Sequence, residues 1–338
     1  MGGKEVENGQ WLKVEDAHLL VIKNATCKGT NCSDFQSNWA HATRCSPQGS
    51  RRRSMATHGF CNTWSAPSLM DGPKGSKHVP WLLPLYGPWS GSFQHFTRDY
   101  APKLALVPEG VLRDPRLHVL VERSSNAIVN GILEAFGISR DRQLSPQEVH
   151  TVTAERVYIP AAPAYDNQRY LYELYRRRLG VRYKSPPARR TIMYFSRHGA
   201  SSRRISNEDS LLLRLTNWIA LRGRNERLVT FSRASTLNST VKSLSDVKLF
   251  IGAHGGGMYN TFLLPANTAI IEFAPLENTY HPICRSGSVL SHWYWMFPWP
   301  NMGHRTTSGP IDIDLLQVFF ERALQHLDDM HLNTSPAR

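Results

Sequence analysis

The sequence lacks any long apolar stretch. None of its runs approaches the roughly 18 consecutive apolar residues that a membrane-spanning helix requires. Its beginning does not show the charged-then-apolar pattern of a secretory signal peptide. Internal repeats, a Walker phosphate loop, a Gly-x-Gly-x-x-Gly fingerprint and paired Cys-x-x-Cys motifs are also missing. We therefore expect no membrane span in this chain, and neither a fibrous repeat nor a zinc ribbon.

Lysine is scarce, whereas arginine is abundant. The 338 residues contain 30 Arg and 10 Lys, and the net charge is +13. From residue 176 to residue 233, 14 Arg and one Lys stand against three carboxylates, a net charge of +12. Because the positive charge is concentrated there, we expect that stretch to bind an anionic ligand. A nucleic-acid surface is an alternative, but no helix-turn-helix or RNP pattern accompanies the arginines, so we predict no nucleic-acid partner.

Cysteines are few and unevenly placed. Cys284 stands alone, and the other four fall within 35 residues: Cys27, Cys32, Cys45 and Cys61. Two disulfides that staple a loop-rich segment would explain this cluster, and buried thiols of a cytosolic protein are the alternative. Four Asn-x-Ser/Thr sequons are compatible with a lumenal glycoprotein, and they begin at Asn24, Asn31, Asn238 and Asn333.

The hydrophobic pattern divides the chain into four segments. They are an irregular cysteine-bearing cover (residues 1–80), an α/β domain (81–183), a second α/β domain (184–310) and a closing amphipathic helix (311–338). In the first α/β domain we predict strands over 118–122 and 152–159. Helices are predicted over 126–136, with Ser125 as N-cap and Gly137 at its end, and over 166–179, which Gly180 ends.

The second α/β domain alternates more regularly. Strands are predicted over residues 191–196, 228–231, 248–251 and 269–273. A helix is predicted over 207–221 with Asn207 as its N-cap. Such a strand–helix succession predicts a parallel sheet with helices on both faces.

A glycine-rich loop follows the strand at 248–251. It contains Gly252, His254 and three successive glycines, Gly255, Gly256 and Gly257, and then enters a helix. The amides at a helix N-terminus suit a phosphate group, and glycines allow a ligand to approach the backbone. Tight strand-to-helix packing would also explain the glycines, and His254 could be a capping residue.

Two further groups are expected at the same sheet edge. Glu272 ends the next strand, where its carboxylate could accept hydrogen bonds from ribose hydroxyls or pair with an arginine. Arg197 and Arg203 lie on one strand-to-helix loop, and a guanidinium matches phosphate oxygens bidentately. Together with the glycine loop, these residues predict a site for a nucleoside diphosphate.

These segments resemble the motifs of a known family. Ser196-Arg197, Arg203-Arg204-Ile-Ser-Asn-Glu, Gly252-Ala-His-Gly-Gly-Gly and Ile270-Ile-Glu-Phe-Ala-Pro resemble the motif series of glycosyltransferase family 61. This family includes protein O-GlcNAc transferases and plant xylosyl- and arabinosyltransferases. The segment from His95 through Asp99 to Pro102-Lys-Leu resembles the family's His-x-x-x-Asp-x-x-Pro-Arg-Leu. Gly256 replaces the usual alanine, and a longer spacing leaves open whether Arg203 or Arg204 matches the family's arginine.

The resemblance implies a GT-B fold, in which two Rossmann-like domains face each other across a cleft and a C-terminal helix crosses back. It also implies an inverting transfer from a UDP-sugar to a hydroxyl of a glycan or glycoprotein, in the lumen of the Golgi or endoplasmic reticulum. No cofactor or metal is expected, and no metal-binding Asp-x-Asp motif. Arginines and a helix N-terminus would neutralise the leaving diphosphate instead.

An inverting transfer needs a base on the acceptor hydroxyl. Asp99 is our first choice because it matches the family's acidic position. His95 lies four residues earlier, on the same helix face, and could be the base or could orient Asp99. Alternatively, the His–Asp contact has only a structural role and stabilises the helix. A glycosyltransferase-like carbohydrate-binding protein without activity is the alternative function, and the donor sugar and acceptor are left open.

Overall fold

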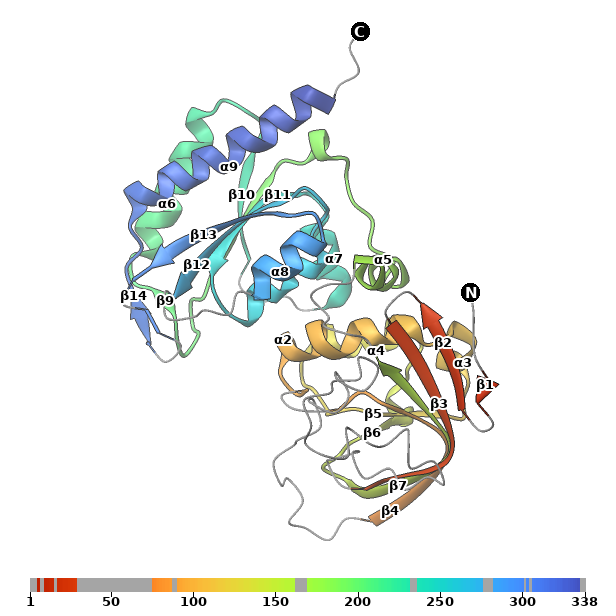
Figure 1. The fold of residues 1–338 in the computed structure, drawn as a ribbon. Helices are drawn as coiled ribbons and strands as arrows, with labels where there is room; N and C mark the ends of the chain where they lie inside the picture. The colour runs from red at the N-terminus through yellow and green to blue at the C-terminus, as the bar shows by residue number, and fades with distance from the viewer. Residues whose placement is uncertain are drawn as a thin grey trace, which may run out of the picture. The chain divides into compact units, whose positions relative to one another are not determined.

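The computed structural model describes residues 5–6, 9–14, 17–28, 75–86, 90–161, 169–231, 236–275, 282–300, 302–303 and 306–334. The chain divides into two compact units, residues 1–179 and residues 180–338, and each is described by itself (Figure 1). The boundary predicted from the sequence, after residue 183, falls a few residues later. No described helix is both long and apolar enough to span a bilayer.

Unit 1 is built on a mixed sheet. The order of its described strands is β1-β2-β3-β7-β4-β5-β6. Their bounds are β1 Glu5–Val6, β2 Gly9–Val14, β3 Ala17–Lys28, β4 Gly75–Pro84, β5 Leu117–Leu120, β6 Gln143–Leu144 and β7 Val149–Ala161. The pairs β7–β4, β4–β5 and β5–β6 are parallel, whereas β3 is antiparallel to both β2 and β7. β7 follows β6 along the chain but lies on the other side of β4, so the strand order reverses between β4 and β7.

The first strands differ from the prediction. Residues 9–14 and 17–28 form a hairpin, although irregular structure was predicted for residues 1–80. The hairpin continues the sheet because β3 pairs with β7 over most of its length. Cys27 lies on β3, and the other three clustered cysteines lie outside the described residues, so the disulfides stay a prediction.

Helices of unit 1 begin and end where local chemistry requires. α4 (Ala127–Ala135) is capped by Asn126, whose Oδ1 accepts from the amides of Ile128 and Val129. The N-cap predicted at Ser125 is therefore wrong by one residue. Gly137 ends this helix with φ of +76°, a conformation that glycine adopts without strain. The remaining helical segments are α2 Phe93–His95, η2 Phe96–Tyr100, η3 Ala101–Leu106, α3 Glu109–Arg113, η4 Arg140–Arg142 and α5 Arg169–Arg178.

Unit 2 contains the parallel sheet that the sequence predicted. Its main strands follow the order β10-β8-β11-β12-β13, and each neighbouring pair is parallel. Their bounds are β8 Thr191–Phe195, β10 Arg227–Phe231, β11 Val247–Ala253, β12 Ala269–Pro275 and β13 Trp293–Trp299. Two short strands, β9 (Arg204–Ile205) and β14 (Ser308–Gly309), pair separately. No strand was predicted at the position of β13.

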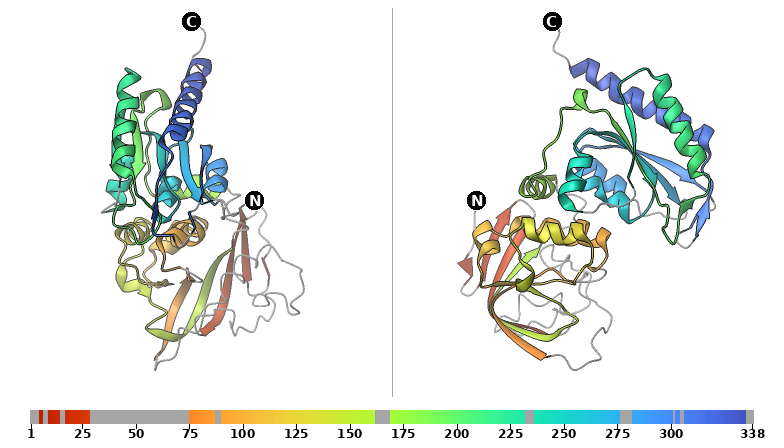
Figure 2. Two further views of the ribbon diagram at one scale, coloured as in Figure 1. Left: turned by 90° about the vertical axis from the view of Figure 1, so that its left-hand side faces the viewer. Right: turned by 180° about the vertical axis from the view of Figure 1, so that it is seen from behind.

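Helices cover both faces of this sheet. Figures 1 and 2 show α6 and α9 side by side on one face and α7 and α8 on the other. Their bounds, with the flanking 3₁₀ segments, are η6 Pro186–Ala188, α6 Glu208–Leu221, α7 Leu237–Leu244, η7 Gly256–Leu263, α8 Pro282–Val289 and α9 Ile313–Thr334. The predicted covering of both faces is confirmed. That α9 also crosses back to unit 1 stays a prediction.

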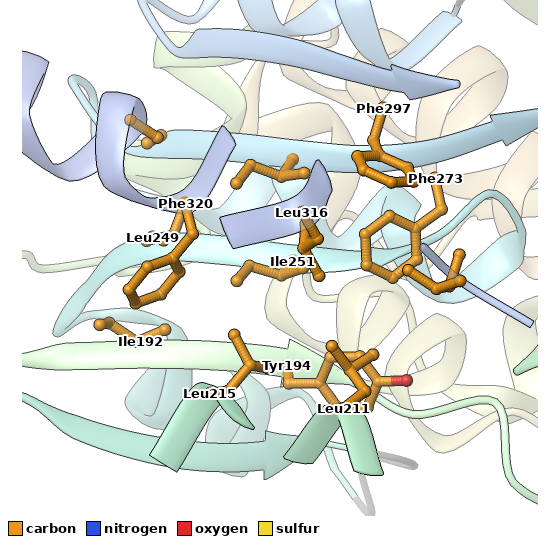
Figure 3. Close-up of a cluster of buried hydrophobic side chains, with 14 of the residues drawn as sticks. Ile192, Tyr194, Leu211, Leu215, Leu249, Ile251, Phe273, Phe297, Leu316 and Phe320 are labelled. Atoms are coloured by element: carbon orange, nitrogen blue, oxygen red, sulfur yellow. The ribbon is translucent and has the colours of Figure 1, made fainter. Parts of the chain in front are cut away.

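The core of unit 2 lies between the sheet and the α6–α9 face. Apolar side chains recur on α6 at a helical spacing, and Leu211 and Leu215 are fully buried there. Phe320 of α9 packs on Trp218, with ring centroids 5.4 Å apart. Burial of each such side chain contributes about 1.5–3 kcal/mol. Figure 3 shows this cluster, labelled at Ile192, Tyr194, Leu211, Leu215, Leu249, Ile251, Phe273, Phe297, Leu316 and Phe320.

Asn207 joins the two covering helices. It occupies the predicted N-cap position of α6, but its side chain makes no capping bond there. Instead, its Nδ2 donates to the carbonyl of Ile311 at 2.8 Å, and its Oδ1 accepts from the Ile311 amide at 2.9 Å. The side chain therefore fixes the segment that leads into α9.

Candidate nucleotide site and candidate base

The order of strands in unit 2 points to one edge of its sheet. After β8 the chain adds β10 on one side, and then β11 on the other side of β8. At such a reversal the loops that follow the two strands diverge, and open α/β sheets bind ligands there, beyond the carboxyl ends of the strands. Arg197 follows β8 and His254 follows β11. The residues predicted from the two motifs thus meet at the reversal.

Arg197 packs directly on the glycine loop. Its Nε and Nη2 donate to the carbonyl of Ser202 at 3.2 and 2.9 Å. A Cβ added at Gly255 would overlap Nη1 of Arg197 and lie 2.9 Å from Cζ. A side chain at position 255 would therefore displace this guanidinium from its position.

The same loop approaches β8 closely at a second glycine. A Cβ at Gly257 would lie only 1.6 Å from Cζ of Phe195. The loop continues into η7, where the Met258 amide donates to the Gly255 carbonyl at 2.9 Å. Tight packing therefore explains Gly257, whereas Gly255 accommodates a charged side chain.

Arg203 lies on the connection from β8 to α6 in a strained conformation. Its φ is +55°, which is uncommon for a residue other than glycine. The backbone is held there because its amide donates to the carbonyl of Thr306 at 2.8 Å. Arg203 is half-buried, and the neighbouring Arg204 is exposed.

Two half-buried guanidiniums are thus held close together. Burial lowers the pKa of Arg197 to about 10, and the charge of Arg203 acts in the same direction. Burial also lowers the pKa of Arg203, while Tyr259 and Glu272 raise it. Like charges kept together in a partly desolvated place favour an anion between them. Arg203 lies close enough to Glu272 for the two charges to interact.

His254 and Glu272 form a buried pair. Nδ1 of His254 lies 2.6 Å from Oε1 of Glu272, and Glu272 is 1% exposed. The second carboxylate oxygen, Oε2, accepts from the Tyr294 hydroxyl at 2.6 Å. Both Glu272 oxygens are therefore engaged within the protein, and their contact with a ribose stays a prediction.

In unit 1, the two candidates for the catalytic base, His95 and Asp99, lie in contact. His95 Nδ1 lies 2.9 Å from Oδ2 of Asp99, although the intervening turn is a π-helix. Arg98 binds the same carboxylate through Nε to Oδ1 and through Nη2 to Oδ2, the latter at 3.0 Å. Asp99 is 5% exposed, whereas the side chain of His95 is 22% exposed. Of the two, His95 is the group within easier reach of a substrate.

Lys103 adds a buried amine to this cluster. It lies one turn beyond Asp99 and is 7% exposed, with Nζ 5.5 Å from the ring centroid of Tyr100. Burial lowers its pKa to about 8, against the opposing effect of Asp99. The resemblance places an arginine at this position, so a cation is retained here.

Metal-binding residues do not gather in the part of the chain that the structure describes. No group of three His, Cys, Asp or Glu side chains there could hold a metal ion. The expectation of no Asp-x-Asp motif is wrong for the sequence, because Asp312 and Asp314 form one. Both are exposed at the start of α9, where Asp312 Oδ1 accepts from the Leu315 amide at 2.9 Å. Asp312 thus caps the helix, and Asp314 lies in its first turn.

A comparison with protein families identifies the family of the chain. A model of the family "Glycosyltransferase 61" matches residues 93–271, which is more than half of the chain. The chain belongs to glycosyltransferase family 61. Membership indicates glycosyltransferase activity, and it implies a sugar donor and a glycan acceptor. A comparison with curated proteins finds no match.

The family 61 match covers most of the predicted site. It begins just before His95 and ends one residue before Glu272, so that Tyr294 lies beyond it. Sequence reasoning missed Tyr294 because no strand was predicted over residues 293–299. It also missed Arg98, although a basic residue directly before the predicted base was a readable signal.

Proposed function

We propose that this family 61 glycosyltransferase transfers a sugar from a UDP-sugar to a hydroxyl of a glycan or glycoprotein, with inversion and without a metal ion. The observation that carries the proposal is the contact of Arg197 with Gly255, because it joins two separate motifs at the reversal of a parallel sheet. The half-buried charges of Arg197 and Arg203 support a diphosphate as the ligand.

Each group at the edge has a role in this proposal. Arg197 and Arg203 bind the diphosphate through charge-assisted hydrogen bonds, and backbone amides at Gly255–Gly257 contribute further donors. His254 donates a hydrogen bond to the same group. Glu272 orients His254 through Oε1, and its carboxylate retains lone pairs that accept from a ribose hydroxyl. These cations neutralise the charge that develops on the departing UDP, the part that Mg²⁺ plays in metal-dependent transferases.

In unit 1 we propose His95 as the base in place of Asp99, our first choice from the sequence. Arg98 binds both oxygens of Asp99, so that carboxylate is already engaged within the protein. Asp99 then orients His95 through Nδ1, and Nε2 takes the proton of the acceptor hydroxyl. The acceptor oxygen forms a bond to the anomeric carbon as the bond to UDP breaks on the opposite side. One proton moves to His95, and UDP leaves with the electron pair.

The arrangement and location of the enzyme follow from the family resemblance. We propose a GT-B arrangement of the two units and a place in the lumen of the Golgi or endoplasmic reticulum. The clustered cysteines and the four sequons support an oxidising compartment.

Binding of UDP to arginine variants tests the nucleotide site. Arg203→Ala removes a half-buried guanidinium beside Glu272, and we expect UDP affinity to fall roughly tenfold to a hundredfold. Arg204→Ala, which truncates the exposed neighbour, is expected to leave UDP affinity close to that of the wild-type chain. Calorimetric titration measures both. Unchanged affinity in Arg203→Ala would remove this arginine from the site, and loss only in Arg204→Ala would assign the role to its neighbour.

A further inference from the structure

We propose that Tyr294 is a positioning residue that, through Glu272, holds His254 as a protonated hydrogen-bond donor to the diphosphate. The inference rests on the proposed function, because it assigns the proton of one group at the nucleotide site. It differs from that function in its consequence. Binding of the diphosphate and protonation of His254 support each other, so UDP binding takes up a proton from solution.

The three side chains come from consecutive parts of one sheet. His254 follows β11, Glu272 is on β12 and Tyr294 is on β13, and the register places Glu272 beside Gly252 on one side and Met296 on the other. Both hydrogen bonds to the carboxylate measure 2.6 Å. Because Glu272 and Tyr294 lie on neighbouring paired strands, the sheet itself fixes the hydrogen bond between them.

The direction of each hydrogen bond follows from the charges. Burial raises the pKa of Tyr294 well above its usual value, and the charge of Glu272 raises it further. The phenol therefore stays protonated and donates to Glu272. With that donor in place, the carboxylate accepts from His254, so Nδ1 carries a hydrogen and Nε2 is the atom that binds or releases a proton. This is the arrangement in which a carboxylate stabilises an imidazolium.

The groups around His254 oppose one another. The carboxylate of Glu272 lies against Nδ1 of His254, and the Tyr294 hydroxyl holds that carboxylate in place. Arg197 and Arg203 disfavour a third positive charge at the same edge, and Tyr259 of η7 lies close to Arg203. A diphosphate removes this opposition because it brings negative charge to all three cations. Protonation of His254 therefore increases when the diphosphate binds.

Glu272 is an unusual residue for its position in the sheet. Glu272 is 1% exposed in the middle of a sheet whose other buried residues on β12 are mostly apolar. Buried ion pairs contribute little to stability, and apolar residues of similar volume often replace them without loss. The charge at 272 is thus better explained by a function than by packing.

The same sheet offers a matched control. Tyr194 on β8 is also buried, and its hydroxyl donates to Glu208 Oε1 at 2.8 Å. It belongs to the apolar cluster on the α6–α9 face, away from the face that carries Glu272. Tyr194→Phe and Tyr294→Phe therefore remove the same kind of hydrogen bond, but only the second acts on His254.

Calorimetry of the full chain tests the proposal. UDP is titrated at about pH 8, where the last proton of a phosphate has already left, because its pKa is about 6. Titrations in two buffers with different ionisation enthalpies give the number of protons taken up on binding. We expect a fractional proton uptake in the wild-type chain and in Tyr194→Phe, and none in His254→Asn. Glu272→Gln is expected to lose the uptake and about tenfold in UDP affinity, and Tyr294→Phe to reduce both.

The outcomes separate this inference from the proposed function. If the wild-type chain binds UDP without proton uptake, or if uptake is the same in Tyr294→Phe and Tyr194→Phe, the inference is wrong and the nucleotide site stands. If the wild-type chain does not bind UDP, both fail. Thermal unfolding confirms that each variant is folded, and should Glu272→Gln fail to fold, Tyr294→Phe decides.

Discussion

Two glycines at the nucleotide site, Gly255 and Gly257, allow other side chains to pack against the backbone. Gly255 leaves room for the guanidinium of Arg197, whereas Gly257 leaves room for the ring of Phe195. Both contacts join the loop after β11 to the strand or loop before α6. Glycine at these positions therefore brings two motifs together, in addition to any contact that it makes with a ligand.

Gly255→Ala tests this role of a single methyl group. The added Cβ would displace Arg197, so we expect UDP affinity to fall at least about tenfold. Gly223→Ala is the control, since Gly223 has φ of +61° but no atom within 4 Å of an added Cβ. It should lose about 1 kcal/mol of stability and keep its UDP affinity. Equal UDP affinity in both variants, measured by titration, would contradict the contact.

The sequence predicts which polar residues belong to the site better than it predicts the side chains that they contact. Arg197, Arg203 and His254 follow predicted strands, and the parallel order of those strands places them at one edge. The hydrogen bond of Tyr294 to Glu272 depends on β12 and β13 being neighbours in register. Strand neighbours are set by the whole sheet, so no local pattern announces this bond.

At the scale of elements, α9 is tied to the sheet by a buried ion network. Asp328 on α9 accepts from Lys248 Nζ at 3.0 Å and from Arg222 Nη2 at 2.7 Å. Lys248 also donates to Glu226 Oε1 at 2.6 Å. Burial raises the pKa of Asp328, but its bonds to Lys248 and Arg222 outweigh burial and leave the pKa below its ordinary value. The network holds the end of α9 that lies away from Asn207.

Protonation of Asp328 in acid and its substitution should both weaken the ion pairs with Lys248 and Arg222. Because the folded pKa of Asp328 is depressed, its stabilisation is complete above the unfolded value of about 4 and is lost as the pH falls through the folded value. Asp328→Asn is expected to lower the free energy of unfolding by about 3 kcal/mol near neutral pH. Urea unfolding at several pH values measures this, with the exposed Asp329→Asn as control. A difference between wild type and Asp328→Asn that stays constant into acid would contradict the assignment.

Elements were predictable where their own residues carry the signal. The four main strands of residues 191–273 and the helix α6 were found because apolar periodicity marks them, whereas α7 was not predicted. The hairpin of β2 and β3 was missed because its pairing with the long strand β7 is non-local. The N-cap of α6 was found at Asn207, but its bond to Ile311 joins residues far apart in sequence.

At the scale of the molecule, both units use the same topological device. Each contains parallel strands whose order reverses once, between β4 and β7 in unit 1 and between β8 and β11 in unit 2. His95 and Asp99 lie on the connection that leaves β4, and Arg197 and Arg203 lie on the connection that leaves β8. The candidate base and the candidate nucleotide site thus occupy equivalent connections in two separate units, which agrees with membership of glycosyltransferase family 61.

Hydrogen exchange of the full chain, with and without UDP and in the presence of a metal chelator, tests the central claim most directly. Mass spectrometry of the exchanged peptides reports which backbone amides the ligand protects. We predict protection in residues 197–206 and 253–258, with no requirement for a metal ion. Protection confined to other parts of the chain, or none at all with UDP bound in excess, would contradict a diphosphate site at this edge of the sheet.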